Sequence, residues 1–184
     1  MGFAVMDRLA ERHSILLTRR QGQSLCGRFL LNEEEVWLIK PQTYMNLSGG
    51  AVKVWLAKQN CGPEDLLVIA DEMDLPFGTL RIRLKGGAAG HHGVESIIDA
   101  IGSQEFSRLR IGVCPDHPIT DTVEYLLSPM KKSQRREMEE VIDRASEAVE
   151  TILKEGPAKA MNLFNQRNSA SSAPSNPASA EGKS

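Results

Sequence analysis

The amino-acid sequence predicts an α/β fold, a single domain with a mixed β-sheet flanked by helices. Segments with the pattern of strands and segments with the pattern of helices mingle along most of the chain, which is typical of this class. The 184 residues suffice for one domain with a sizeable buried core. Their 41% hydrophobic and 25% charged content is ordinary for a globular protein. We expect this domain to cover residues 1–167.

The first part of the chain predicts a helix, a hairpin and a second helix. Residues 2–13 place Phe3, Met6, Leu9 and Ala10 on one helical stripe. Two strands are expected at 24–31 and 35–40, joined by the acidic turn Asn32-Glu-Glu. A loop then leads to a helix at 50–60, which the breaker Gly62-Pro63 ends.

The rest of the chain alternates strands and helices and ends in a polar tail. The expected strands are 66–70, 79–85 and 106–113, and the expected helices are 94–101, 120–127, a long one from about 133, and 158–165. The long helix carries an apolar stripe from Met138 to Leu153, which we interpret as core packing. From Asn168 the sequence is too poor in apolar residues to fold, so a disordered tail is expected at 168–184.

Carboxylates follow directly after the strand at 66–70. The apolar run delivers Asp71 to a strand end, and Pro76 and Gly78 then favour a turn. The next strand alternates apolar and basic residues, so Arg81 and Arg83 share one face.

A glycine-rich loop at 86–90 follows, and glycine lets a substrate approach the backbone closely. The loop leads to His91 and His92 at a helix start. An acid, a row of cations, a flexible loop and two imidazoles so close in sequence predict a site for a polyanionic substrate.

Composition excludes several classes of protein. A net charge of −2 argues against indiscriminate coating of nucleic acid, although local basic clusters can bind a particular RNA. Cys26, Cys61 and Cys114 are few and widely spaced, which indicates reduced cytosolic thiols. No apolar run approaches the roughly 20 residues that span a bilayer, and no signal peptide is visible. We expect a cytoplasmic protein that does not bind membranes.

A metal site is the alternative interpretation of the central stretch. Glu72 and Asp74 could join His91 and His92 around an ion. Adjacent histidines on an irregular loop seldom reach one ion together, and hard cations usually gather more carboxylates. We therefore expect no metal and no other cofactor.

Four ordered segments resemble the bacterial peptidyl-tRNA hydrolase family. They are Lys40-Pro-Gln-Thr-Tyr-Met-Asn-Leu-Ser-Gly49, Asp71-Glu-Met-Asp-Leu-Pro-Phe-Gly78, Gly86-Gly-Ala-Ala-Gly-His-His-Gly93 and Phe106-Ser-Arg-Leu-Arg-Ile-Gly112, and Asn162-Leu-Phe-Asn165 is also similar. The resemblance covers residues 2–165. It implies an esterase that cleaves the bond between a peptide and the 3′ ribose of its tRNA, which recycles tRNA for translation. It also implies a monomer without an obligate protein partner.

The resemblance implies roles for three residues near the scissile ester. Asp71 matches the aspartate that orients a catalytic histidine, and that histidine acts as general base on water. Asn46 matches the asparagine that hydrogen-bonds the substrate, and its amide offers the donors and the acceptor that a peptide main chain needs. Tyr44 lies where the family has an aromatic substrate-binding residue.

Five further residues receive roles from the same resemblance. Arg81, Arg83 and Arg110 lie where the family has basic residues that hold tRNA phosphate. His91 and His92 lie in the element that lines the substrate site. The family pattern there is Gly-His-Asn-Gly, so His92 replaces an amide by an imidazole.

The family also begins with a core strand, a glycine-rich loop carrying an asparagine, and a Thr-Arg-His-Asn element before the first helix. Here Met1-Gly2-Phe3 aligns with the start of that helix. We therefore expect that Met1 is not the natural start and that upstream residues supply the catalytic histidine. The alternative is a catalytically inactive relative that binds RNA.

Overall fold

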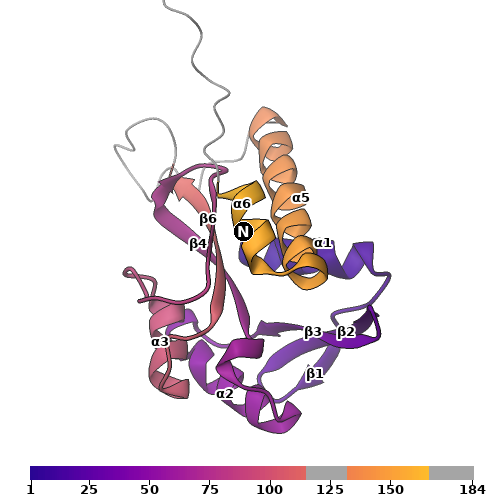
Figure 1. Cartoon of the computed structure of the whole chain (residues 1–184), viewed down its shortest axis with the longest axis vertical. Helices are drawn as coiled ribbons and strands as arrows, with labels where there is room; N and C mark the ends of the chain where they lie inside the picture. The colour runs from indigo at the N-terminus through magenta and orange to yellow at the C-terminus, as the bar shows by residue number, and fades with distance from the viewer. Residues whose placement is uncertain (115–131, 166–184) are drawn as a thin grey trace, which may run out of the picture.

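The computed structural model describes residues 1–114 and 132–165, which form helices around two three-stranded sheets (Figure 1). The predicted α/β class is confirmed. The strands divide between an antiparallel sheet and a mixed sheet. The helix expected at 120–127 and the tail expected at 168–184 lie outside the described residues.

The antiparallel sheet has the order β1-β2-β3, with β1 (Arg19–Gln21), β2 (Ser24–Leu31) and β3 (Glu34–Pro41). The predicted hairpin is confirmed as β2 and β3. Its turn residues Asn32 and Glu33 have φ values of 51° and 70°, as a tight hairpin turn requires. Strand β1 is additional to the predicted elements.

The mixed sheet has the order β4-β6-β5, with β4 (Leu67–Pro76), β5 (Leu80–Arg83) and β6 (Ser107–Cys114). The central strand β6 pairs in parallel with β4 and antiparallel with β5. Strand β4 continues beyond the predicted end at residue 70. It pairs regularly with β6 as far as Glu72, then is irregular and pairs again at Pro76. Asp71 therefore lies within a strand.

Helices cover both faces of the mixed sheet. The helices are α1 (Gly2–Arg12), α2 (Ser48–Gln59), α3 (His92–Ile101), α5 (Lys132–Glu155) and α6 (Pro157–Phe164), with 3₁₀ turns η1 (Met45–Leu47) and η2 (Pro63–Asp65). Figure 1 shows α1, α5 and α6 gathered together, away from α2 and α3. Leu80, Ile82, Leu109 and Ile111 belong to the core with α1, α5 and α6. Ala70 and Phe106 belong to the core with α2 and α3.

The predicted apolar stripe of α5 is confirmed as core packing, because Ile142 and Val149 are buried against α1 and the mixed sheet. The stripe predicted for α1 is wrong at Phe3, whose side chain is 50% exposed. Val5 and Leu9 are the fully buried residues of that helix. A helix packed on one side buries positions four apart, such as Val5 and Leu9. Phe3 comes two residues before Val5, about 200° around the helix, so it lies on the other side.

No helix in the part of the chain that the structure describes has both the length and the apolar character needed to cross a membrane.

Charged side chains join α1 to α5. Arg8 bonds to both Asp143 and Glu139, and Arg12 donates to Asp143 at 3.0 Å. The bond from Arg8, followed by that from Arg12, holds the pKa of the Asp143 carboxyl below its usual value. A carboxyl with a lowered pKa in the folded state stabilises the fold above its unfolded pKa, and this contribution disappears as pH falls through the folded pKa.

Asp143→Asn is expected to lower the free energy of unfolding at pH 7 by about 1 kcal/mol or less, the range of partly exposed ion pairs. The gap between variant and wild type should start to narrow below about pH 4, the usual pKa of an aspartate, and should close as pH falls through the lowered pKa of the folded state. Urea unfolding at pH 7, 4 and 3 measures the difference in free energy of unfolding and its change with pH. Asp99→Asn on the exposed face of α3 is the control, and a gap that persists unchanged at pH 3 would contradict the linkage.

Candidate active site

Asp71 lies where β4 meets the amino end of α1. The Gly2 N–H donates to Asp71 Oδ1 at 3.1 Å, and the Met1 ammonium lies 3.2 Å from Oδ2. The positive end of a helix dipole favours a carboxylate at this position. The Asp71 side chain remains 42% exposed, so solvent and substrate can still reach it.

Gly2 allows this close approach of α1 to the sheet. A Cβ at Gly2 would lie 2.7 Å from the carbonyl oxygen of Ile69, which is shorter than side chains tolerate. The glycine therefore fixes the helix end next to the Asp71 carboxylate. Among the residues that the structure describes, no histidine contacts Asp71: His13 pairs with Glu150, and His91 and His92 lie at the start of α3.

The segment that carries Tyr44 and Asn46 packs against the start of α3. Tyr44 is 82% exposed, and Asn46 is also exposed on η1. A Cβ at Gly93 would lie 3.0 Å from Met45 Cγ, so α3 approaches this turn as closely as glycine permits. The structure thus brings the predicted substrate-binding residues Tyr44 and Asn46 next to the histidine pair.

The two histidines differ in their surroundings. His91 is the N-cap of α3, and its Nδ1 accepts a hydrogen bond from the Val94 N–H at 3.2 Å. With Nδ1 as an acceptor, Nε2 is the ring nitrogen left to bond other groups. His92 is 77% exposed, and its contact within residues 1–114 and 132–165 is a long one of 3.4 Å from Nδ1 to Glu95. His92 is therefore free to contact a substrate, whereas His91 also supports the helix.

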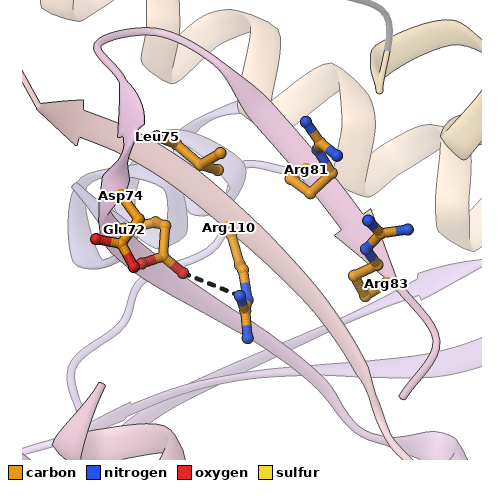
Figure 2. Close-up of a pocket in the computed structure, with 6 residues that line it drawn as sticks. All are labelled: Glu72, Asp74, Leu75, Arg81, Arg83 and Arg110. Carbon is orange, nitrogen blue, oxygen red and sulfur yellow. Dashed lines mark ion pairs between the residues drawn. The ribbon is translucent and has the colours of Figure 1, made fainter. Parts of the chain in front are cut away.

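The three predicted phosphate-binding arginines lie along β5 and β6 (Figure 2). Arg81 and Arg110 are directly opposite in the antiparallel pair. Arg110 pairs with the buried Glu72 at 3.0 Å and donates to the Gly87 carbonyl at 2.9 Å. Arg81 and Arg83 form no ion pair with any residue that the structure describes. Together these side chains, with Asp74 and Leu75, line a hollow of about 170 Å³.

Asp71 and the arginines lie on opposite faces of the mixed sheet. Asp71 is the register partner of the core residue Ile111, whereas Arg110 is the partner of Ala70 in the other core. Successive residues of a strand point to opposite faces, so neighbours in sequence separate here. The sequence favoured one compact site, but the structure separates it into a carboxylate beside α1 and a cationic surface on the far face.

Arg108 is a buried residue that the sequence did not single out. Its guanidinium donates to the Gly86 carbonyl, to Gly87 at 2.8 Å and to Gln104 at 3.2 Å, and it lies 4.2 Å from the Phe106 ring centroid. Burial, followed by the nearby charge of Arg110, lowers the pKa of this guanidinium. Arg108 therefore fixes the glycine loop in front of His91.

Asn165 holds the edge of the mixed sheet. Its side chain accepts from the Ile82 N–H at 2.6 Å and donates to the Ile82 carbonyl at 3.1 Å. These bonds replace a strand neighbour for β5 between Arg81 and Arg83. The sequence signal was Asn162-Leu-Phe-Asn165, but its structural role required knowledge of which strand forms the edge.

A metal centre finds no support in the geometry. Within residues 1–114 and 132–165, no three of the His, Cys, Asp and Glu side chains gather as metal ligands would. Glu72 is instead paired with Arg110.

Comparisons with known proteins agree on one family. The family model described as peptidyl-tRNA hydrolase matches residues 1–172. The chain is 45% identical to the peptidyl-tRNA hydrolase of Koribacter versatilis, over 91% of this chain and 84% of that protein. It is 44% identical to that of Solibacter usitatus, over 91% and 85%. The crystal structure of peptidyl-tRNA hydrolase from Acinetobacter baumannii matches with a TM-score of 0.77 and 30% identity, over 89% of this chain and 84% of that one.

Proposed function

Because the chain belongs to the peptidyl-tRNA hydrolase family, we propose that it hydrolyses the ester between a peptide and the 3′ ribose of tRNA. The products are a free peptide and a free tRNA. The observation that carries this proposal is the Asp71 carboxylate bonded to the amino end of α1. In the family that this chain resembles, the catalytic histidine lies just before that helix, which is the position beside Asp71.

The proposed chemistry is general-base catalysis. A histidine beside Asp71 removes a proton from water as the water oxygen attacks the ester carbonyl carbon. The bond between that carbon and the ribose 3′ oxygen then breaks, and the 3′ oxygen takes the proton from the imidazolium to leave as the tRNA hydroxyl. The aspartate fixes the tautomer of the imidazole and stabilises the imidazolium that forms. The exposed Asn46 amide hydrogen-bonds the peptide main chain, and Tyr44 and His92 contact the substrate next to it.

We propose that the cationic surface of Arg81, Arg83 and Arg110 binds the tRNA phosphates. The guanidinium groups of Arg81 and Arg83 are available to bind phosphate, whereas that of Arg110 already pairs with Glu72. We place the reaction in the cytoplasm, where the substrate is made. We propose that the domain of residues 1–167 acts as a monomer and needs no cofactor.

The direct test is hydrolysis of N-acetyl-aminoacyl-tRNA labelled in its acyl group. We expect release of labelled acyl-amino acid, and the same rate in EDTA. A rate abolished by EDTA would indicate a metal-dependent hydrolase. Tight tRNA binding without hydrolysis, by the chain extended with a segment that carries the histidine, would favour the RNA-binding alternative.

Arg81→Gln and Arg83→Gln are each expected to weaken tRNA binding. Each lost phosphate contact should reduce the slope of log affinity against log salt by about 0.7 to 0.9. The effect should be independent of the peptide, because phosphate contacts position a nucleic acid without reading sequence. Filter binding over a salt series measures the slopes.

Arg28→Gln is the matched control, because Arg28 is exposed on the other sheet and pairs with Glu35. Arg110→Gln should also reduce the slope, but it leaves the buried Glu72 carboxylate unpaired, so its thermal stability must be measured alongside. Unchanged slopes in the Arg81, Arg83 and Arg110 variants would show that this surface does not bind tRNA.

His92→Asn is expected to change the affinity for a substrate mimic by about 1 kcal/mol or less, the size of a single neutral hydrogen bond. The exposed imidazole has only its long contact with Glu95, so the fold should not suffer. Calorimetric titration measures the affinity, and Glu95→Gln controls for the lost contact. A tenfold or greater loss of affinity would mean that the imidazole itself is required.

A further inference from the structure

The amino end of α2 lies directly against α3, and Gly49 is the point of closest approach. A Cβ at Gly49 would lie 1.9 Å from the carbonyl oxygen of Ser96 and 2.8 Å from Ala100 Cβ, so any side chain at this position would collide with α3. Figure 1 shows the two helices side by side. The backbones of α2 and α3 therefore touch at the residue where α2 begins its first turn.

The hydroxyl of Ser96 caps α2 from the neighbouring helix. The first N–H groups of a helix have no acceptor within the helix, and the side chain of the preceding residue often supplies one. In α2 that preceding residue is Leu47, whose side chain has no acceptor. The Gly49 N–H donates instead to Ser96 Oγ at 3.0 Å. Ser96 thus supplies the N-terminal acceptor that Leu47 lacks.

Asn46 lies between two contacts with α3. On one side of it in the sequence, Met45 packs against Gly93, and on the other side Gly49 bonds to Ser96. Gly93 and Ser96 are three residues apart in α3, so both contacts use one face of that helix. The short turn that presents the exposed Asn46 is therefore attached to α3 at both ends.

The same face of α3 also carries His92, which comes one helical turn before Ser96. The contact between α2 and α3 therefore sets the position of Asn46 relative to His92. Two groups bind one substrate together only when their separation matches that substrate, and a small displacement costs binding or rate. The hydroxyl of Ser96 supplies the polar bond in this contact.

We infer that Ser96 is a positioning residue for the substrate site, because its hydroxyl holds the turn that carries Asn46 in place on α3. The inference rests on the proposed function, in which Asn46 hydrogen-bonds the peptide main chain. Ser96 acts through Asn46, since its half-buried hydroxyl is bonded to Gly49. Loss of the hydroxyl weakens binding of the peptide part of the substrate and leaves binding of the tRNA part unchanged.

The probes are a tRNA that carries an N-acetylated amino acid through a 3′ amide bond, which replaces the ester, and the same tRNA without the acyl group. Filter binding below the melting temperature of every variant gives both affinities. Wild type should bind the acylated tRNA about tenfold more tightly than the deacylated one. Asn46→Ala should lose about fivefold for the acylated tRNA, as one neutral hydrogen bond would. Ser96→Ala should lose about three- to fivefold for the acylated tRNA and nothing for the deacylated one.

The double variant distinguishes positioning from a general effect on the fold. If Ser96 acts through Asn46, Ser96→Ala together with Asn46→Ala should bind the acylated tRNA no more weakly than Asn46→Ala alone. A general loss of order would instead lower the affinity further. Ser96→Asp should keep the wild-type affinity, because a carboxylate also accepts from the Gly49 N–H and is favoured at the amino end of a helix.

Ile97→Val is the matched control for stability. It removes one carbon from a residue of α3 that is 5% exposed and belongs to the core shared with α2. Its melting temperature should fall, as that of Ser96→Ala should, because a buried carbon is lost. Both tRNA affinities of Ile97→Val should stay at the wild-type values, since the bond between Gly49 and Ser96 is kept.

The inference would be overturned, with the proposed function left intact, by any of three results. They are an equal loss for both tRNAs in Ser96→Ala, a loss in Ser96→Asp as large as in Ser96→Ala, and a loss from Ser96→Ala that is undiminished in the Asn46→Ala background. Equal binding of the two tRNAs by wild type would also overturn it, and the hydrolysis test above would still decide the proposed function. Failure of wild type to bind either tRNA would overturn both.

Discussion

A version of the chain extended upstream of Met1 by a strand, a glycine loop with an asparagine and a Thr-Arg-His-Asn element is expected to hydrolyse peptidyl-tRNA faster than the 184-residue chain. The expected gain is about 10²- to 10⁴-fold, the usual contribution of a general base. Asp71 is bonded to the first residues of α1, so a histidine just before that helix comes within its reach.

Two controls separate the base from the added sequence. The same extension with alanine in place of its histidine should give none of the gain. Asp71→Asn in the extended chain should lose most of the gain with little change in melting temperature, because an asparagine oxygen still accepts from the Gly2 N–H.

Single-turnover hydrolysis of N-acetyl-aminoacyl-tRNA is the measurement. Equal rates for the histidine and alanine extensions would show that the base lies elsewhere, and the assignment of Asp71 as its orienting partner would fall. The double variant carries Asp71→Asn together with the alanine extension. If it loses no more of the hydrolysis rate than either single variant, the two residues act as one unit.

Local patterns were sufficient to predict much of the fold. The β2–β3 hairpin has the predicted strand bounds to within one residue, because alternation and the acidic turn act over a few neighbours. Strand β1 was not predicted, because three residues of which two are exposed arginines show no recognisable alternation of apolar and polar side chains. The division into two sheets depends on which distant strands pair, and no local pattern carries that information.

The candidate site shows the same limit. The resemblance pointed to Asp71, Asn46 and the arginines, but the strand register alone placed Asp71 on the face opposite Arg110. Arg108 and Arg110 have the same position in the alternating pattern of β6. Arg108 nevertheless bonds three carbonyls, two from the glycine loop and one from Gln104, whereas Arg110 bonds one carbonyl of the loop and pairs with Glu72.

Replacing Arg108 by methionine is therefore expected to have a large effect on stability. The variant removes a donor from the carbonyl groups of Gly86, Gly87 and Gln104, although Gly87 keeps its bond from Arg110 and Gln104 its bond from the Gly86 N–H. Each buried acceptor left unsatisfied costs about 1 to 3 kcal/mol. Gly87 and Gln104 are exposed and can turn to water, so we expect a total loss of about 2 to 4 kcal/mol.

The loop itself should loosen in the same variant. Backbone amides of residues 86–91 should exchange with solvent faster than in wild type, by more than the global loss of stability explains, because Arg108 donates two bonds from β6 to that loop and Arg110 donates one. Arg108→Lys should have exchange rates between those of wild type and Arg108→Met, because an ammonium keeps the charge but lacks the planar set of donors of a guanidinium.

Urea unfolding and amide hydrogen exchange give both quantities. Arg136→Met is the matched control, because Arg136 is 84% exposed and its ion pair is with the exposed Glu140, so the stability of this variant should change by about 0.5 kcal/mol or less. The start of α3, with His91 as its N-cap, follows directly on the loop. Affinity for a substrate mimic should therefore fall when the loop amides lose their protection from hydrogen exchange. A stable Arg108→Met variant with unchanged exchange at residues 86–91 would show that the glycine loop holds its shape without the buried guanidinium.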